Sequence, residues 1–212
     1  MGLGKTIQMI SLLILIQKTS QQSSDVSKPH LLVLPTSLIG NWKAEIQKFA
    51  PQLSFFLAHS SNAVNSVNAV KLTNIDLVIT TYGSLHRFPW LIEQDWNLVI
   101  LDEAQAIKNS TAKQTSTAKS IKSRVRFVLT GTPVENRILD LWSLFDFIAP
   151  GLLGSSKEFA KYGNKKKSEE LENNNDNIEK ENEKWIQSRN VNFIASVGKL
   201  VAILCKFFAG SQ

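Results

Sequence analysis

Cysteine and histidine are scarce in this sequence of 212 residues, and their scarcity narrows the kinds of site that it can hold. The one cysteine, Cys205, cannot form a disulfide within the chain, which favours the reducing cytoplasm as the location. The three histidines, His30, His59 and His86, do not show the spacing of a metal-ligand motif. We therefore expect neither a disulfide-stabilised secreted protein nor a histidine-based metal site.

Long apolar runs are also missing. A membrane-spanning helix needs about 20 consecutive apolar residues. Residues 7–16 are mostly apolar but form too short a segment, and residues 191–208 are interrupted by Lys199 and Lys206. We expect no membrane association, and we interpret residues 191–208 as an amphipathic or buried helix.

Negative charge is in the minority. The chain has 24 Lys and Arg against 18 Asp and Glu, a net charge of +6. Residues 1–150 contribute 14 minus 10, or +4. This charge is compatible with a polyanionic partner but does not require one.

Helical and extended patterns alternate over residues 1–150. The extended segments are short apolar runs with little polar alternation, at 31–34, 53–58, 76–80, 97–101 and 125–129. The helical segments are 5–18, 37–50, 112–121 and 138–148. In the second of these, Leu38, Trp42, Ile46 and Phe49 lie on one side. Strands buried on both faces and separated by helices predict an α/β domain with a mostly parallel sheet and helices on both faces.

The composition changes after residue 150. Residues 151–190 include a stretch dense in Lys, Glu and Asn, which predicts a polar linker or insertion, either a solvated helix or disordered. Residues 191–212 are predicted to form a short helical tail. The domain organisation expected is therefore 1–150, 151–190 and 191–212.

The first residues carry the most specific motif. Gly4-Lys5-Thr6 is the second half of a phosphate-binding loop, G-x-x-x-x-G-K-[ST], whose backbone N–H groups and lysine surround nucleotide phosphates. The opening half and the strand before it would precede Met1. The chain is therefore expected to be a fragment, a split gene or a product of a misplaced start, and we leave these alternatives open.

Two adjacent carboxylates follow an apolar run. Asp102 and Glu103 come directly after residues 98–101, at the carboxyl end of a predicted strand, where open α/β sheets bind ligands. Taken alone, such a pair is usually a strand end with surface acids. After a Gly-Lys-Thr in the same α/β pattern, it predicts a carboxylate for Mg²⁺ and a second one that orients or deprotonates water.

Thr130-Gly131-Thr132-Pro133 follows another predicted strand. Its plain interpretation is a turn, because glycine and proline interrupt regular structure anyway. If this segment lies at the same nucleotide site as Lys5 and Asp102, it is a candidate phosphate sensor or coupling loop.

The order and spacing of these motifs resemble those of the Swi/Snf-type helicase-like ATPases, over roughly three-quarters of the chain. The matching segments are 1–13 for motif I, 32–38 with Asn41 and Trp42 for motif Ia, 80–83 for motif Ib, 102–105 for motif II and 129–136 for motif III, continuing to 151. The Asp-Glu-Ala-Gln form of motif II is similar to that of bacterial members.

This resemblance implies the fold and a nucleotide site. The fold would be a RecA-like P-loop NTPase lobe, the first of two lobes that close on ATP. The implied nucleotide-binding residues are Gly2, Gly4, Lys5 and Thr6. By position, Lys5 would contact the phosphates, Thr6 and Asp102 would hold Mg²⁺, and Glu103 would activate the attacking water.

The resemblance also implies a double-stranded DNA partner, along which the two lobes would move without separating the strands. The implied DNA-facing residues are Thr36, Ser37, Thr81 and Tyr82, and the implied coupling residues are Thr130, Gly131 and Thr132. For Thr36 and Ser37, a helix N-cap fits their position equally well. In a bacterium the protein would be cytoplasmic and associated with the nucleoid.

The resemblance stops short of the second lobe, whose motifs would deliver arginines to the γ-phosphate. We expect the chain to be inactive alone, and two other hypotheses remain open. One is a non-catalytic remnant that binds nucleotide or DNA, and the other is a lobe that acts in trans with a separate second lobe. Trp42, Trp96 and Trp142 are expected to pack in the core or at an interface rather than stack on a ligand.

Overall fold

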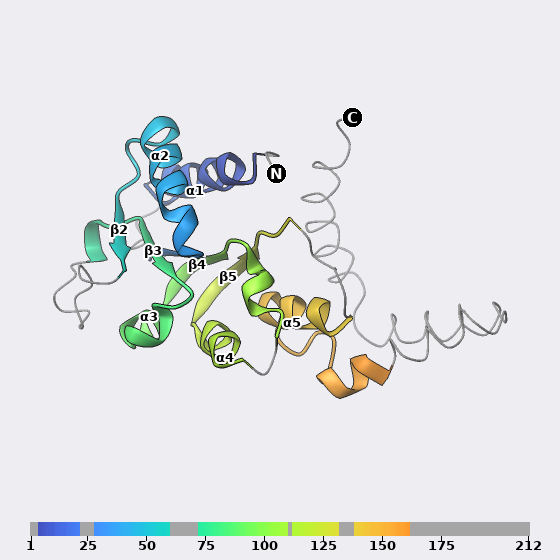
Figure 1. Ribbon diagram of the computed structural model, residues 1–212. Coiled ribbons are helices and arrows are strands. Elements are labelled where there is room, and N and C mark those ends of the chain that lie inside the picture. The colour runs from blue at the N-terminus through green and yellow to red at the C-terminus, as the bar shows by residue number, and fades with distance from the viewer. Residues whose placement is uncertain (1–3, 22–27, 60–71, 110–111, 132–137, 162–212) are drawn as a thin grey trace, which may run out of the picture. The chain divides into compact units, whose positions relative to one another are not determined.

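A five-stranded parallel sheet forms the centre of the first structural unit, residues 1–150 (Figure 1). The computed structural model describes residues 4–21, 28–59, 72–109, 112–131 and 138–161. In these residues the strand order is β2-β3-β1-β4-β5, and every neighbouring pair is parallel. The predicted α/β fold with a parallel sheet is confirmed.

The elements follow the predicted alternation closely. The strands are β1 (His30–Leu34), β2 (Phe55–Ala58), β3 (Leu77–Thr81), β4 (Trp96–Leu101) and β5 (Ser123–Val128). The α-helices are α1 (Lys5–Gln21), α2 (Ile39–Phe49), α3 (Trp90–Glu93), α4 (Lys113–Ser120) and α5 (Ile138–Ile148). Short 3-10 helices are η1 (Thr36–Leu38), η4 (Leu72–Asn74), η5 (Leu85–Arg87) and η6 (Ala104–Ile107). The short α3 was not predicted, because four residues are too few to show a helical period.

The sheet separates two hydrophobic layers, because successive side chains of a strand point to opposite faces. Leu32 of β1 belongs to the layer shared with α1 and α2, which includes Ile46. Val33 belongs to the other layer, which includes Trp90 of α3 and Phe147 of α5. Figure 1 shows α1 and α2 on one side of the sheet and α3 and α4 on the other. The prediction of helices on both faces is therefore confirmed.

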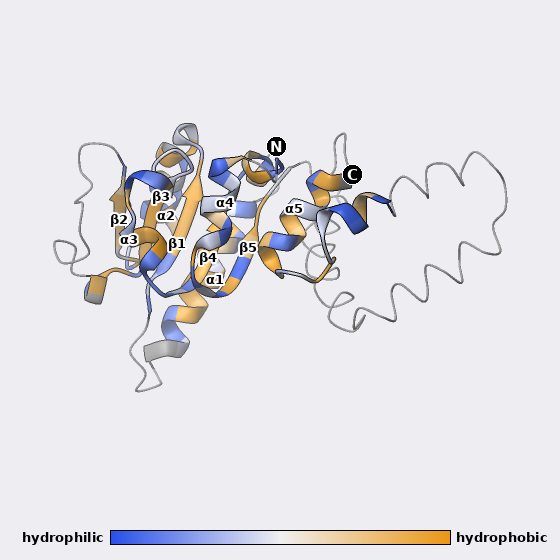
Figure 2. Ribbon diagram, turned by 90° about the horizontal axis from the view of Figure 1, so that it is seen from below, coloured by the Kyte–Doolittle hydropathy of each residue, from blue (hydrophilic) through white to orange (hydrophobic). Residues whose placement is uncertain are grey.

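The central strands are more deeply buried than the strand at the β5 edge. Every residue of β1 and of β3 is buried. In β5, by contrast, Arg124 and Val125 are exposed. Figure 2 shows β1 as hydrophobic over most of its length and β5 with hydrophilic positions. This difference is expected for a strand with a neighbour on one side only.

One residue on the predicted apolar side of the helix at 37–50 is exposed. Trp42 and Ile46 of α2 are each 1% exposed, whereas Phe49 is 43% exposed. Phe49 is the last residue of the helix, and the chain then turns so that Ala50 and Leu53 enter the core instead. The Lys48 ammonium lies 5.1 Å from the centre of the Phe49 ring, which shields part of it from water.

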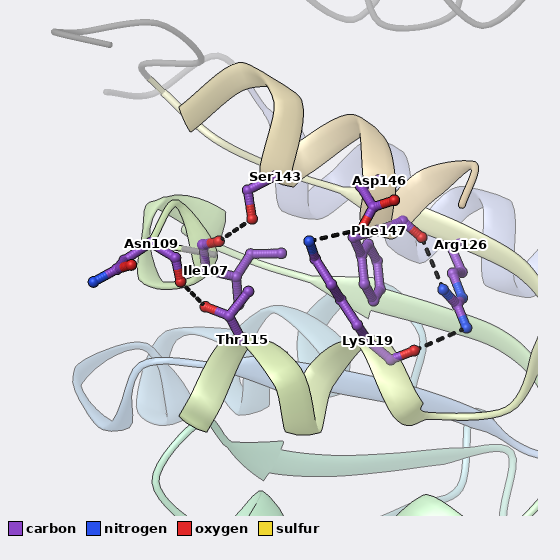
Figure 3. A network of polar contacts seen from close by, with 8 residues as sticks. All are labelled: Ile107, Asn109, Thr115, Lys119, Arg126, Ser143, Asp146 and Phe147. Carbon is purple, nitrogen blue, oxygen red and sulfur yellow. Dashed lines mark hydrogen bonds and ion pairs between the residues drawn. The ribbon is translucent and has the colours of Figure 1, made fainter. Parts of the chain in front are cut away.

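A polar network joins α4, β5 and α5 on one face of the sheet (Figure 3). Arg126 of β5 donates to the carbonyl oxygens of Phe147 (2.9 Å), Ile121 (2.7 Å) and Lys119 (3.4 Å). Lys119 in turn pairs with Asp146 at 2.8 Å. These contacts satisfy carbonyl groups at the ends of two helices and fix α5 against the edge strand.

The second structural unit, residues 151–212, is described only from 151 to 161. Its predicted polar segment and helical tail lie almost wholly outside the described residues, so both remain predictions. Among the described residues, no helix combines the length and apolarity that a membrane crossing requires.

Candidate functional site

Four strands end along the same edge of the sheet. Leu34 of β1 is in register with Thr81 of β3, and Leu101 of β4 is in register with Val128 of β5. Val33 also pairs with Leu101, which links the two pairs of strands. The segments that follow these strands therefore lie next to one another, although they come from four separate parts of the chain.

Lys5 reaches this edge from the start of α1. Gly4, just before the helix, has a φ of +67°, a left-handed conformation that glycine adopts without steric cost. The Lys5 Nζ lies 4.0 Å from Glu103 Oε1, and the two side chains are 24% and 18% exposed. A Cβ at Gly131 would lie 3.8 Å from the same Nζ. The structure thus brings Lys5, Glu103 and Gly131 together.

Asp102 lies at the end of β4 and is only 6% exposed. Its Oδ2 accepts a hydrogen bond of 2.7 Å from the indole Nε1 of Trp42, and its Oδ1 accepts one of 2.9 Å from the backbone N–H of Glu103. The Tyr82 hydroxyl donates to the Asp102 carbonyl oxygen at 2.9 Å. Both the carboxylate and the backbone of Asp102 are therefore held by neighbouring elements.

Glu103 has an unusual backbone. Its φ of 46° and ψ of 54° are left-handed, and among the described residues it is the one non-glycine with a positive φ. Such a conformation costs about 1–3 kcal/mol and persists only where the surroundings impose it. Asp102 N–H bonds to the Val33 carbonyl at 2.8 Å and Ala104 N–H to the Leu129 carbonyl at 3.0 Å, which fixes the chain on both sides of Glu103.

The segment after Glu103 is held in turn by two helices. Ser143 of α5 donates to the Ile107 carbonyl at 2.7 Å, and Thr115 of α4 donates to the Asn109 carbonyl at 2.6 Å (Figure 3). The carboxylate pair is thus supported from the strand side and from the helix side.

The predicted DNA-facing residues fall into two groups. Thr36 and Ser37 are exposed, and neither the cap of η1 nor that of α2 makes a side-chain hydrogen bond. The N-cap alternative for these hydroxyls is therefore not seen. Thr81 and Tyr82 are buried, at 3% and 5% exposure, so a direct DNA contact by these side chains stays a prediction.

Thr81 and Tyr82 use their hydroxyls inside the protein. Thr81 Oγ1 lies 2.8 Å from Ser84 Oγ, which also lies 3.2 Å from His59 Nδ1. Burial, together with the charges of Asp102 and Glu103, raises the pKa of Tyr82 well above its ordinary value. The phenol therefore stays protonated and remains a donor to the Asp102 carbonyl.

Thr6, in the first turn of α1, and Thr130, which follows β5, are partly buried, whereas Gly2 and Thr132 lie outside the described residues. Trp42 was predicted to pack in the core or at an interface, and it is buried in the core, but its bond to Asp102 was not predicted. The two residues are 60 positions apart, and no sequence pattern predicts which buried group an indole N–H will meet.

The chemistry of the donors fits a magnesium–nucleotide group. Mg²⁺ prefers oxygen ligands and is usually held by one or two carboxylates plus phosphate oxygens and water rather than by a complete protein cage. Asp102 offers such a carboxylate, and each oxygen keeps a lone pair beyond its hydrogen bond. In the part of the chain that the structure describes, no group of three His, Cys, Asp or Glu side chains could hold a metal ion. The nearby Lys5 ammonium suits a phosphate.

Comparison with known proteins identifies similar chains. The model of the SNF2-related domain matches residues 1–194. The putative ATP-dependent helicase/translocase YwqA of Bacillus subtilis is 42% identical over 163 residues, covering 76% of this chain and 17% of that protein. The TATA-binding protein-associated factor mot1 of Schizosaccharomyces pombe is 38% identical over 167 residues, covering 75% of this chain and 9% of that protein.

Solved structures of a SWI2/SNF2 ATPase core are also similar to this chain. The Sulfolobus solfataricus SWI2/SNF2 ATPase core in complex with double-stranded DNA is 42% identical, with a TM-score of 0.66, covering 75% of this chain and 32% of that one. The same core domain by itself gives a TM-score of 0.64. The chain therefore spans less than a third of this structural relative and less than a fifth of the two curated relatives.

Proposed function

Because the chain belongs to the SNF2-related domain family, we propose that it is the first, ATP-binding lobe of a DNA-dependent ATPase that moves along double-stranded DNA. The family and the RecA-like fold are those of a Swi/Snf-type ATPase domain. The substrate, the DNA partner and the need for a second lobe belong to our proposal.

One observation carries the proposal. Lys5, Glu103 and Gly131 come from three distant motifs and meet at the edge of the sheet where Asp102 also lies. A lysine at a helix start, a metal-binding carboxylate and a second carboxylate are the parts that phosphoryl transfer to water requires. A strand end with surface acids, the plain alternative, does not account for a nearly buried Asp102 held by three neighbours.

The residues would divide the work as follows. Lys5 binds the β and γ phosphates, Thr6 and Asp102 hold Mg²⁺, and Glu103 takes the proton of the attacking water. Bound Mg²⁺ would neutralise charge that develops on the phosphate oxygens. Thr130, Gly131 and Thr132 follow β5 and would transmit the state of this site to the DNA-facing segments.

Lys5 provides the direct test of nucleotide binding. In the presence of Mg²⁺, Lys5→Ala is expected to weaken ATP binding by about tenfold or more, because a charge-assisted contact is worth about 1.5–3 kcal/mol. Equilibrium binding of a fluorescent ATP analogue, competed with ATP, measures the change. Lys18→Ala is the matched control, since Lys18 is exposed in the last turn of the same helix. Equal affinity of the Lys5 and Lys18 variants would contradict the proposed site.

DNA binding is expected to be weak, tolerant of sequence and steeply dependent on salt, because phosphate contacts carry no base information. Ser37→Ala should weaken binding to all duplexes equally and leave the salt dependence unchanged, since a neutral hydroxyl releases no counterion. Fluorescence anisotropy with two unrelated duplexes at several salt concentrations tests this. Ser116→Ala, at an exposed position of α4, is the control. Tight, sequence-selective binding that ignores salt would refute the DNA proposal.

A further inference from the structure

Trp42 makes a contact that its role in the core does not explain. The side chain is 1% exposed and belongs to the hydrophobic layer under α1 and α2. Its indole N–H, however, points to the carboxylate of Asp102, with Nε1 2.7 Å from Oδ2. A buried tryptophan usually finds a hydrogen-bond partner for its indole N–H, and any carbonyl group can serve as that partner.

Two other buried tryptophans, Trp96 and Trp90, differ from Trp42 in what their indole N–H contacts. Trp96 is equally buried, at 1% exposure, and donates 2.8 Å to the carbonyl of Leu91, five residues away. The Nε1 of Trp90 is buried and has no hydrogen-bond partner in the described part of the chain. Trp42 instead bonds a carboxylate 60 residues away, at the strand end where the site lies.

The contact has a consequence for Asp102. A hydrogen bond to an ionised carboxylate is stronger than one between neutral groups, and it selects one orientation of the side chain. With Oδ2 bound to Trp42 and Oδ1 bound to the Glu103 N–H, rotation of the carboxylate would break at least one of these bonds. The Tyr82 hydroxyl holds the carbonyl group of the same residue at 2.9 Å.

We propose that Trp42 is a positioning residue for the metal: its indole N–H fixes the Asp102 carboxylate in the orientation that binds Mg²⁺, with Tyr82 holding the backbone. This inference rests on the proposed function, and both residues would act through Asp102 rather than by touching the metal or nucleotide. Loss of a residue that hydrogen-bonds a metal ligand typically lowers metal affinity by about 10–100-fold.

The test separates metal positioning from packing. Nucleotide affinity is measured with Mg²⁺ and again with EDTA. The dissociation constant in EDTA divided by that with Mg²⁺ gives the gain in affinity that Mg²⁺ confers. Trp42→Phe keeps an aromatic ring but removes the N–H, and it is expected to reduce this ratio by about tenfold. A loss of packing alone would weaken binding equally in both conditions and leave the ratio unchanged.

Trp96→Phe is the matched control, since it removes an equally buried indole whose bond goes to a carbonyl. It should lower the melting temperature much as Trp42→Phe does, with the wild-type ratio retained. Tyr82→Phe removes the hydroxyl that holds the Asp102 backbone and is expected to reduce the ratio several-fold. It tests the anchoring of Asp102 whether or not Trp42→Phe folds.

A folded Trp42→Phe variant that keeps the wild-type ratio refutes the positioning role of Trp42. A folded Tyr82→Phe variant that keeps it refutes the role of Tyr82. The proposed function stands in both cases. If the wild-type protein gains no nucleotide affinity from Mg²⁺, the proposed function fails and the positioning role fails with it.

Discussion

Residues 1–212 by themselves are expected to hydrolyse ATP at least about 10³-fold more slowly than the same residues joined to a second RecA-like lobe. Phosphoryl transfer depends almost entirely on positioning and electrostatic stabilisation, and an arginine directed at the γ-phosphate contributes about 10³–10⁵ in rate. The three residues that we place at the site, Lys5, Asp102 and Glu103, provide one ammonium and two carboxylates but not this guanidinium group. We propose that a second lobe supplies these arginines, as the resemblance to the Swi/Snf-type ATPases implies.

The measurement is phosphate release with and without duplex DNA. One sample is the 212-residue chain, and the other is this chain joined to the part of the Bacillus subtilis relative that follows the matched region; the two proteins are 42% identical over that region. The whole relative provides the upper reference. Robust DNA-stimulated turnover by residues 1–212 alone would show that the second lobe is not needed. No turnover in the joined protein, with the reference active, would favour a non-catalytic remnant.

Glu103→Gln in the joined protein is expected to lower kcat by about 10²–10⁴ while ATP still binds, because general base catalysis typically contributes that much. Glutamine has nearly the same shape but cannot accept the proton of water. It also keeps a Cβ, so the positive φ of 46° costs a similar amount in both proteins and stability should change little.

Single-turnover hydrolysis and ATP affinity are measured side by side, so that chemistry is separated from binding. Glu93→Gln is the control, because Glu93 is an exposed carboxylate on the short α3 helix. Retention of more than a tenth of the wild-type rate by Glu103→Gln would assign the base to another group. If Glu103→Gln lowered ATP affinity by the same factor as the hydrolysis rate, the 4.0 Å pair of Glu103 with Lys5 would be the important interaction instead.

Sequence patterns predicted the elements of this fold well where the signal is local. The apolar runs at 31–34 and 97–101 correspond to β1 and β4, and the helical pattern at 138–148 matches α5 (Ile138–Ile148). Patterns failed at the ends of elements. Phe49 has helical spacing with Ile46 but lies where α2 stops, and β5 begins two residues before its predicted start at Val125.

At the candidate site, too, some features could be predicted from local sequence and others could not. Lys5, Asp102 and Glu103 could be named from their motifs, and parallel strands must place their carboxyl ends at one edge. That Thr81 and Tyr82 would be buried could not be predicted, because their exposure depends on how the turn after β3 packs against β2 and β4. A sequence motif identifies the residues of a site, but it does not determine whether their side chains are buried or exposed.

The sequence alone therefore determined the α/β alternation, the family resemblance and the carboxylates that follow a buried strand, because these depend on neighbours within a few positions. Only the tertiary structure decided the strand order β2-β3-β1-β4-β5, the left-handed backbone of Glu103 and the bond from Trp42 to Asp102. These features arise from contacts between segments tens of residues apart. Their geometry is set when the whole sheet and its two hydrophobic layers pack together.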